Sequence, residues 1–364
     1  MQTAVSKGTR DISLENLKAL MMLCIFTAHS TSCFRYCGKE LTVPLYVYSQ
    51  IMFSLTTVLS AFFFLSGYFS SLPEKGSFVD GYFAMIKKKI TSLAVPYFLW
   101  NGIYIAIFLI GSLFVPAVKQ WATTLSLNTP WGILDALLGI TYHPADGPLW
   151  YLRNILIISV LFYPFLRCAA RKIGILLPIG VFLLLTMIDL GFDLPDYVQR
   201  YHLAPYSAAA FCFGVFAREK GFRIDFFKKH SWSAIIIGIF AITAYYTLLN
   251  SSAAKMVFIF RNLFMLLMFP VWLSFARFLN WEKESFWYEI ITKPAFFIYA
   301  SHFLCYSVFL HLCASFVPRE CGYQPIILLG IYFSGGCLLM GCGYLTLKKT
   351  FPLLFRLLTG NRNS

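Results

Sequence analysis

Residues 92–117 read SLAVPYFLWNGIYIAIFLIGSLFVPA, a run without one charged side chain. It exceeds the roughly 20 apolar residues that a helix needs to cross the hydrocarbon core of a bilayer. The rest of the chain shares this character, because 59% of its 364 residues are hydrophobic and only 13% are charged. A soluble domain carries about 25% charged residues. The composition predicts an all-α polytopic membrane protein and excludes a disordered chain, a collagen-like chain and an ordinary soluble globule.

Applied to the whole chain, the same length rule predicts ten transmembrane helices. They fall at 15–34, 44–69, 92–117, 149–168, 174–191, 203–217, 231–249, 257–279, 291–316 and 324–346. No linker or soluble domain interrupts them. We therefore expect a single transmembrane domain over residues 1–350 and a short cytoplasmic tail over residues 351–364.

The net charge of +14 comes from 30 Lys and Arg against 16 Asp and Glu. If the N-terminus is cytoplasmic, most of the Lys and Arg residues fall in the inner segments, as the positive-inside rule requires. This alternation predicts that both termini are cytoplasmic. It also accounts for the positive charge without a nucleic-acid partner, and we expect none.

The cysteines do not form the pattern of a metal site. No C-x-x-C motif with a matching second pair occurs among the 10 cysteines, so we expect no zinc site and no other bound metal. A disulfide among Cys33, Cys37 and Cys321 is left open, because these three residues fall where an oxidising face could reach them.

Lys18 and His29 are the first candidates for chemistry. His29 lies eleven residues after Lys18, a separation that turns an α-helix through about 1100°, or three turns plus roughly 20°, so both side chains share one face about 16 Å apart. A cation at the inner membrane surface and a base deep in the bundle suit a long anionic donor with a reactive tip. Alternatively, Lys18 snorkels to lipid headgroups and His29 bonds to a neighbouring helix.

His302 is expected at a similar depth in the span 291–316, so it could face a common cavity with His29. Burial favours the neutral imidazole, which can accept a proton near pH 7 as a general base. A structural role for a single buried histidine is the alternative at either position.

Three further patches combine polar and aromatic residues at span ends. FFFLSGYF (62–69) places Ser66 near an inner end, and GPLWYLRN (147–154) places Trp150, Tyr151 and Arg153 at an outer end. Lys87, Lys88 and Lys89 precede a span that contains Pro96. Taken singly, the lysines are also explained as topology signals, and the Trp and Tyr residues as an interfacial aromatic belt.

In order along the chain, these elements resemble the membrane acyltransferase family 3, the integral-membrane O-acyltransferases that modify glycans. The stretch RDISLENLKALMMLCIFTAHS (10–30) resembles the family's opening span, with Lys18 and His29 at its basic-x10-His motif. The later matches are FFFLSGYF (62–69) to an FF-x-SG element, IKKKITSLAVPYFLW (86–100) to a basic cluster before a Pro-containing span, PLWYL (148–152) to a Leu-Trp-aromatic-Leu motif, and FFIYASHFL (296–304) to a Tyr-x-x-His element.

The resemblance has two departures. The family's opening motif usually has Arg where this chain has Lys18, which keeps the charge but loses bidentate phosphate geometry. Many members carry a Glu shortly after the Trp motif, where this chain has Arg153 and Asn154. This second difference leaves open which polar group orients the acceptor.

The resemblance implies transfer of an acyl group, usually acetyl, from cytoplasmic acyl-CoA to a hydroxyl of a glycan on the far side of the membrane. Acyl-CoA would be a donor substrate, not a tightly bound cofactor, and the acceptor would be a sugar or polysaccharide, free or lipid-linked. The family's use in bacterial envelopes implies a multi-pass protein of the bacterial inner or plasma membrane, in contact with membrane lipids.

The resemblance also implies roles for the candidate residues. The donor would contact Lys18, Ser66 and the cluster Lys87, Lys88 and Lys89. His29 would deprotonate the acceptor or relay the acyl group, and His302 would orient His29 or the thioester carbonyl. The sugar would meet Trp150, Tyr151 and Arg153. Some family members carry a fused extracytoplasmic hydrolase-like domain after the spans. The present sequence ends at residue 364, shortly after its last predicted span, so we expect it to transfer the acyl group alone or to pass it to a separate partner.

Two other functions fit part of the pattern. A polytopic transporter or lipid-linked sugar flippase fits the spans and the basic inner face, although the carboxylates expected of ion coupling are missing from the predicted bilayer centre. An unrelated membrane-bound O-acyltransferase with a buried histidine fits less well, because Lys18 and His29 both fall in the first span. Consumption of acyl-CoA separates either transferase from the transporter.

Overall fold

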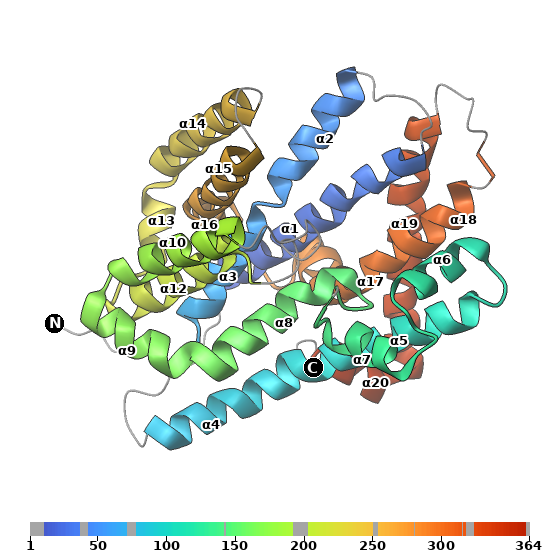
Figure 1. Cartoon of the computed structure of the whole chain (residues 1–364), viewed down its shortest axis with the longest axis horizontal. Coiled ribbons are helices and arrows are strands. Elements are labelled where there is room, and N and C mark those ends of the chain that lie inside the picture. Colours follow the sequence, from blue (N-terminus) through green and yellow to red (C-terminus); the bar gives the residue numbers. More distant parts are fainter. Residues whose placement is uncertain are drawn as a thin grey trace.

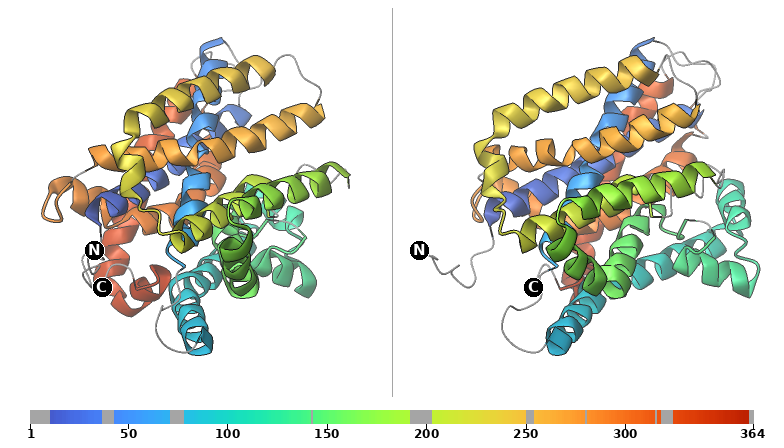
Figure 2. Two further views of the ribbon diagram at one scale, coloured as in Figure 1. Left: turned by 90° about the vertical axis from the view of Figure 1, so that its left-hand side faces the viewer. Right: turned by 60° about the vertical axis from the view of Figure 1, so that its left-hand side comes forward.

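A computed structural model describes residues 11–36, 43–70, 78–141, 143–191, 203–249, 254–279, 281–314, 316–317 and 324–361. Over these ranges every regular element is a helix and no strand occurs. Figures 1 and 2 show the helices gathered into one bundle. The all-α class predicted from the composition is confirmed.

Within the described residues, 8 helical stretches are long and apolar enough to cross a membrane. They are Ile12–Phe34, Pro44–Tyr68, Val79–Gly111, Gly147–Ile173, Ser231–Leu248, Lys255–Phe278, Ala295–Ala314 and Gln324–Thr350. The other two predicted spans, 174–191 and 203–217, appear as shorter helices, α10 (Leu176–Gly191) and α12 (Pro205–Glu219). The chain is therefore a polytopic membrane protein.

The long stretches are built from consecutive helices of different types. The elements of the first half are α1 (Ile12–Ala28), η1 (His29–Tyr36), α2 (Val43–Leu55), α3 (Val58–Tyr68), α4 (Phe78–Lys89), η2 (Ile90–Ala94), α5 (Val95–Gly111), α6 (Pro116–Thr124), α7 (Pro130–Leu138), η3 (Gly147–Leu149), α8 (Trp150–Ile157), η4 (Ile158–Phe162) and α9 (Tyr163–Ile173). After α10 and α12 come α13 (Asp225–Lys229), α14 (Ser231–Leu249), α15 (Ala254–Leu267), α16 (Phe269–Phe275), η5 (Ala276–Phe278), η6 (Tyr288–Thr292), α17 (Ala295–Leu304), η7 (Cys305–Phe309), α18 (Leu310–Ala314), α19 (Gln324–Thr350) and α20 (Pro352–Leu358).

Two glycines let α3 and α12 pack backbone against backbone. A Cβ added at Gly67 would lie 2.1 Å from the Phe211 carbonyl oxygen, and one added at Gly214 would lie 2.1 Å from the Phe64 carbonyl oxygen. Small residues at helix contacts allow this close approach in membranes. Gly67 of the FFFLSGYF motif is thereby explained as a packing residue.

Three of the spans pass through a π-helical turn. These turns are η2 between α4 and α5, η4 between α8 and α9, and η7 between α17 and α18. A π turn inserts an extra residue into the α-helical repeat and is frequent at functional sites. It therefore changes which side chains of a span share a face.

The predicted tail over residues 351–364 contains a helix. Its described part includes α20, which packs against α5 and α19 (Figure 1). Large apolar side chains elsewhere face outward, among them Leu183, Phe240 and Leu338. Such surfaces suit contact with lipid. Cys33 is buried, whereas Cys37 and Cys321 lie outside the described residues.

Candidate active site

A cavity of about 880 Å³ carries lysines from several helix ends. The lysines that line it are Lys18 of α1, Lys88 and Lys89 of α4, Lys293 between η6 and α17, and Lys348 of α19. Along α1 the lining continues from Lys18 to Ile25, about 10 Å deeper into the bundle. The cavity thus has a cationic mouth and an inner end within the membrane-spanning region.

Aromatic and acidic side chains hold the mouth lysines in place. The Lys18 ammonium lies 5.1 Å from the centre of the Phe69 ring, and that of Lys348 lies 5.5 Å from the centre of the Tyr344 ring. Lys293 pairs with Glu289. The mouth also contains Glu15, whose carboxylate accepts a hydrogen bond of 2.9 Å from the Tyr288 hydroxyl. Positive charge therefore exceeds negative charge at the mouth, which favours an anionic ligand.

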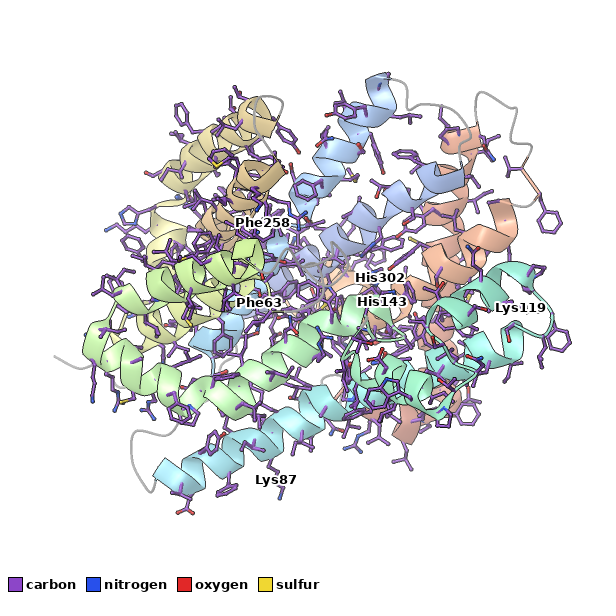
Figure 3. The ribbon with its side chains drawn as sticks, viewed as in Figure 1. Phe63, Lys87, Lys119, His143, Phe258 and His302 are labelled. Atoms are coloured by element: carbon purple, nitrogen blue, oxygen red, sulfur yellow. The ribbon has the colours of Figure 1, made fainter. Side chains whose placement is uncertain are left out.

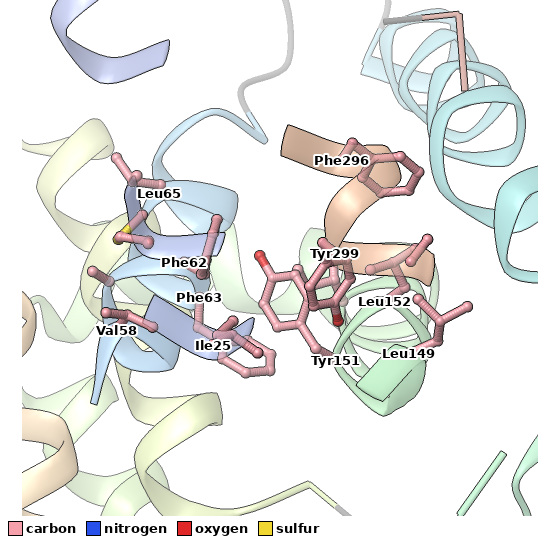
Figure 4. Close-up of a cluster of buried hydrophobic side chains, with 14 of the residues drawn as sticks. Ile25, Val58, Phe62, Phe63, Leu65, Leu149, Tyr151, Leu152, Phe296 and Tyr299 are labelled. Atoms are coloured by element: carbon pink, nitrogen blue, oxygen red, sulfur yellow. The ribbon is translucent and has the colours of Figure 1, made fainter. Parts of the chain in front are cut away.

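The inner end of the cavity is aromatic. Figure 4 shows Tyr151 and Tyr299 side by side between Phe62 and Leu152, and their ring centroids are 6.3 Å apart. The hydroxyls of Tyr151 and Ser66 lie 3.2 Å apart. The Tyr299 hydroxyl donates to the Pro148 carbonyl at 2.5 Å. These bonds fix α8, α3 and α17 around the inner end.

The two histidines predicted to share a cavity come together beside this end. The ring centroids of His29 and His302 are 5.1 Å apart, which confirms that the two residues lie at matching depths. Tyr306 stacks on His29 with centroids 4.6 Å apart and planes 10° apart. The described cavity lining stops short of both imidazoles, but Tyr299 connects them to it, because its ring is 5.9 Å from that of His302.

The hydrogen bonding of His302 defines its tautomer. Nδ1 lies 2.5 Å from the carbonyl oxygen of Tyr299, and a carbonyl can only accept, so Nδ1 carries the proton. The lone pair is then on Nε2, which has no hydrogen-bond partner among the described residues, although the side chain is 0% exposed. His302 therefore offers an unused acceptor next to the His29 ring.

Tyr104 supports the backbone that carries His302. Its hydroxyl accepts a hydrogen bond of 2.9 Å from the Leu304 amide at the start of the π turn η7. It also lies within 3.3 and 3.4 Å of the carbonyl oxygens of Ser301 and Ala300. Tyr104 is fully buried on α5. It thus joins the span after the lysine cluster to the span of His302.

A buried loop closes the other end of α8. Asp146 is 0% exposed, its amide donates to Asn101 Oδ1 at 2.8 Å, and its carboxylate has no partner among the described residues. Burial raises the pKa of Asp146 well above its ordinary value of 3.8 and lowers the pKa of His143. Tyr299 anchors the same loop through Pro148.

The structure gathers several of the predicted site residues and separates others. Lys18, Ser66, Lys88, Lys89 and Tyr151 all line the cavity. Lys87 is exposed on the outer side of α4, as Figure 3 shows, and is not part of the described lining.

Trp150 and Arg153 also fall outside the lining as described. The Trp150 ring packs 6.1 Å from that of Phe63. The guanidinium of Arg153 donates to the Gly139 carbonyl and, at 3.1 and 3.2 Å, to Asn154 Oδ1. Arg153 thus fastens the loop after α7 to α8.

Sequence reasoning missed part of the site. Lys293 and Lys348 line the cavity mouth but belong to none of the recognised motifs. Their positive charge was the only sequence signal for them. Tyr299 is the tyrosine of the Tyr-x-x-His element and could have been found there. Tyr306 and Asp146 carried no signal of their own.

The arrangement suits a reaction between a long anionic molecule and a group activated deep in the bundle. The mouth can hold phosphates by charge-assisted hydrogen bonds. The His29 imidazole, which lies beyond the inner end of the described lining, can take up a proton. Over the described residues no three His, Cys, Asp or Glu side chains gather as a metal site would require.

The chain matches the model of a known protein family. A family model described as an acyltransferase domain matches residues 11–347, nearly the whole chain. No curated protein and no solved structure gave a match.

Proposed function

We infer the reaction of this chain from one premise, that it belongs to acyltransferase family 3, which implies acyltransferase activity. We propose that it is an O-acyltransferase that moves an acyl group, in the simplest case acetyl, from cytoplasmic acyl-CoA to a hydroxyl of an envelope or cell-surface glycan. The bacterial inner or plasma membrane is the location we propose. The observation that carries this proposal is the lysine-lined cavity, which leads from one end of the bundle towards the His29 and His302 pair.

The donor would enter with its phosphates at the lysines and its acylated arm pointing inward. Lys18, Lys88 and Lys348 come from three helices, so they can contact phosphates from different sides. The extended arm would follow the face of α1 towards Ile25 and bring the thioester to Tyr151 and Tyr299. Lys87 would act on the donor only through long-range charge, because it is exposed outside the lining.

His29 would act as the general base. It takes the proton from the acceptor hydroxyl while the hydroxyl oxygen attacks the thioester carbonyl carbon. The carbon–sulfur bond then breaks, and the proton passes to the departing sulfur, giving an ester and free CoA thiol. His302 would orient the charged His29, because its Nε2 is the acceptor left unused beside that ring.

The acceptor would approach from the end of α8 opposite the lysines. Tyr151 and Leu152 of the Trp motif both line the cavity, and Tyr151 is the one with a polar group, so we assign it the contact with the reacting sugar. Trp150 and Arg153 would contribute to acceptor binding from the outer side, Arg153 by holding the loop after α7 in place. The sugar is free or lipid-linked.

Thiol release from acetyl-CoA tests the proposal. Purified protein in nanodiscs is given acetyl-CoA and a panel of mono- and oligosaccharides, with wild type compared with His29→Ala at matched folded fraction. Wild-type turnover that falls at least about a hundredfold in the variant, as expected for loss of a general base, supports the proposal. Turnover that survives the substitution contradicts the role of His29, and folded wild type that neither binds nor consumes acetyl-CoA contradicts the reaction.

A further inference from the structure

The segment after α19 folds back onto the bundle. Residues 351–361 form α20 and a turn, and the side chains of Phe355, Leu358 and Thr359 are buried. Leu353 and Leu357 of the same helix are exposed. A short helix with one buried face and one exposed apolar face suits a position between the protein wall and the lipid interface.

The buried face of this segment contacts the wall of the lysine cavity. The Trp100 indole N–H donates to the Leu358 carbonyl at 3.1 Å, in a buried position. The Phe355 ring lies 5.2 Å from that of Tyr344, which lines the cavity and supports Lys348. The segment therefore contacts both α5 and the end of α19.

Gly360 packs against the Ser92 backbone without room for a side chain. Its φ of 63° is in the left-handed region, and an added Cβ would lie 2.6 Å from the Ser92 carbonyl oxygen. Ser92 also lines the cavity, and its hydroxyl donates to the Lys88 carbonyl at 2.7 Å. Ser92 lies in the π turn η2, directly after the helix that carries Lys88 and Lys89. Only a residue without a side chain fits against this turn in this conformation.

We propose that residues 351–361 form a clasp that positions the cavity mouth, holding the Ser92 turn against the end of α19. The clasp itself does not contact the donor. It fixes the distance between Lys88 on one side and Lys348 on the other, so that donor phosphates meet a preformed set of cations. The proposal rests on the proposed function and adds a positioning segment for donor binding.

Two glycine variants provide a matched test. Gly360→Ala introduces strain at positive φ and a clash with Ser92, whereas Gly221→Ala introduces the same strain at a φ of 72° with nothing within 4 Å of the added Cβ. Each is purified in nanodiscs, and the Kd for acetyl-CoA is measured by calorimetry together with KM and kcat. Trp100→Phe, which removes the bond to Leu358 and part of the ring buried beside Phe297 and Tyr104, is the second route to loosening the clasp.

Gly360→Ala and Trp100→Phe are expected to raise the Kd and KM for acetyl-CoA about three- to tenfold and to leave kcat at saturation unchanged. For Trp100→Phe this is the size of effect expected from losing one buried hydrogen bond. Gly221→Ala should leave the Kd, KM and kcat at their wild-type values. Folded variants with wild-type Kd, or with reduced kcat at unchanged Kd, overturn the clasp.

Hydrogen exchange separates this inference from the proposed function. If the clasp exists, Gly360→Ala speeds amide exchange in residues 86–96 and 340–350 relative to wild type and to Gly221→Ala. That result would hold even if wild type failed to bind acetyl-CoA, in which case only the donor assignment would be wrong. Unchanged exchange in both segments contradicts the clasp itself.

Discussion

His29 lies where α1 ends, as the C-cap residue of that helix and the first residue of η1. The carbonyl end of a helix stabilises a positive charge, which suits a residue that must take up a proton. Tyr306 stacks on the imidazole and His302 lies next to both rings, so together they restrict its orientation. This restraint fits the general-base role that we propose for His29.

Asp146→Asn should change the stability of the folded protein against unfolding in a pH-dependent way. The folded pKa of Asp146 is raised by burial, so the folded protein holds a proton that the unfolded chain loses above about pH 3.9. The stability due to the protonated acid is present below that pH and is lost as the pH rises through the folded pKa. The amide variant, which cannot ionise, should therefore be the more stable protein at pH 8, and the two should converge near pH 4.

Thermal unfolding in detergent at pH 4, 6 and 8 measures this difference. Asp80→Asn is the control, because Asp80 is exposed and its replacement should give a small, pH-independent change. A gain in Tm for Asp146→Asn that is the same at pH 4 and pH 8 would show that the carboxyl is not buried as described.

Among the helices, the contact between α3 and α12 depends on two glycines. Gly67→Ala or Gly214→Ala would place a Cβ 2.1 Å from a backbone oxygen of the partner helix, and neither backbone can yield locally. Overpacking of this kind costs about 1–3 kcal/mol or more. We expect a clear loss of folded protein in fluorescence-detected size exclusion. Gly180→Ala in α10, where nothing lies within 4 Å, should fold as wild type does, and equal yields of all three variants would contradict the close contact.

The π turn η7 is held by a hydrogen bond from the Leu304 amide to Tyr104, and this bond can be removed. Tyr104→Phe removes the acceptor of the Leu304 amide at the start of that turn and should let the backbone around His302 shift. Because Tyr104 does not belong to the described cavity lining, kcat should fall about three- to tenfold while the Kd for acetyl-CoA stays constant.

Tyr97→Phe is the matched control for this element. It lies on the same helix, and its hydroxyl donates to the Leu138 carbonyl at 3.1 Å, away from α17. Steady-state kinetics and donor titration of both variants provide the test. Equal losses of kcat in the two variants would mean that Tyr104 has no special role in positioning His302.

For the whole molecule, the sequence predicted much of the cavity mouth but less of its interior. Lys18, Lys88 and Lys89 were predictable because charges that mark one side of a membrane alternate along the chain. The same rule places Lys293 and Lys348 on that side, but charge alone does not show that they meet at one cavity. That meeting depends on the packing of η6 against α1 and of α19 against α17.

The inner end was less predictable for a physical reason. Helical periodicity assumes a regular repeat, and the π turns η2, η4 and η7 each interrupt it. Tyr306, which stacks on His29, lies within the π turn η7. Arg153 was predicted to meet a sugar from its position and charge, whereas its bond to Gly139 depends on how the loop after α7 folds back.

Sealed vesicles can show whether the donor enters at the lysine mouth. Protein is reconstituted in liposomes, and a protease-cleavable tag after residue 364 reports which way the α20 end of the bundle faces. Acetyl-CoA is then supplied on one side only, with the saccharide panel on the other. Donor entry at the lysine mouth predicts thiol release when the donor is on the side of α20, and none from the opposite side. Release only when the donor is supplied on the opposite side, or from neither side with folded protein, would contradict it.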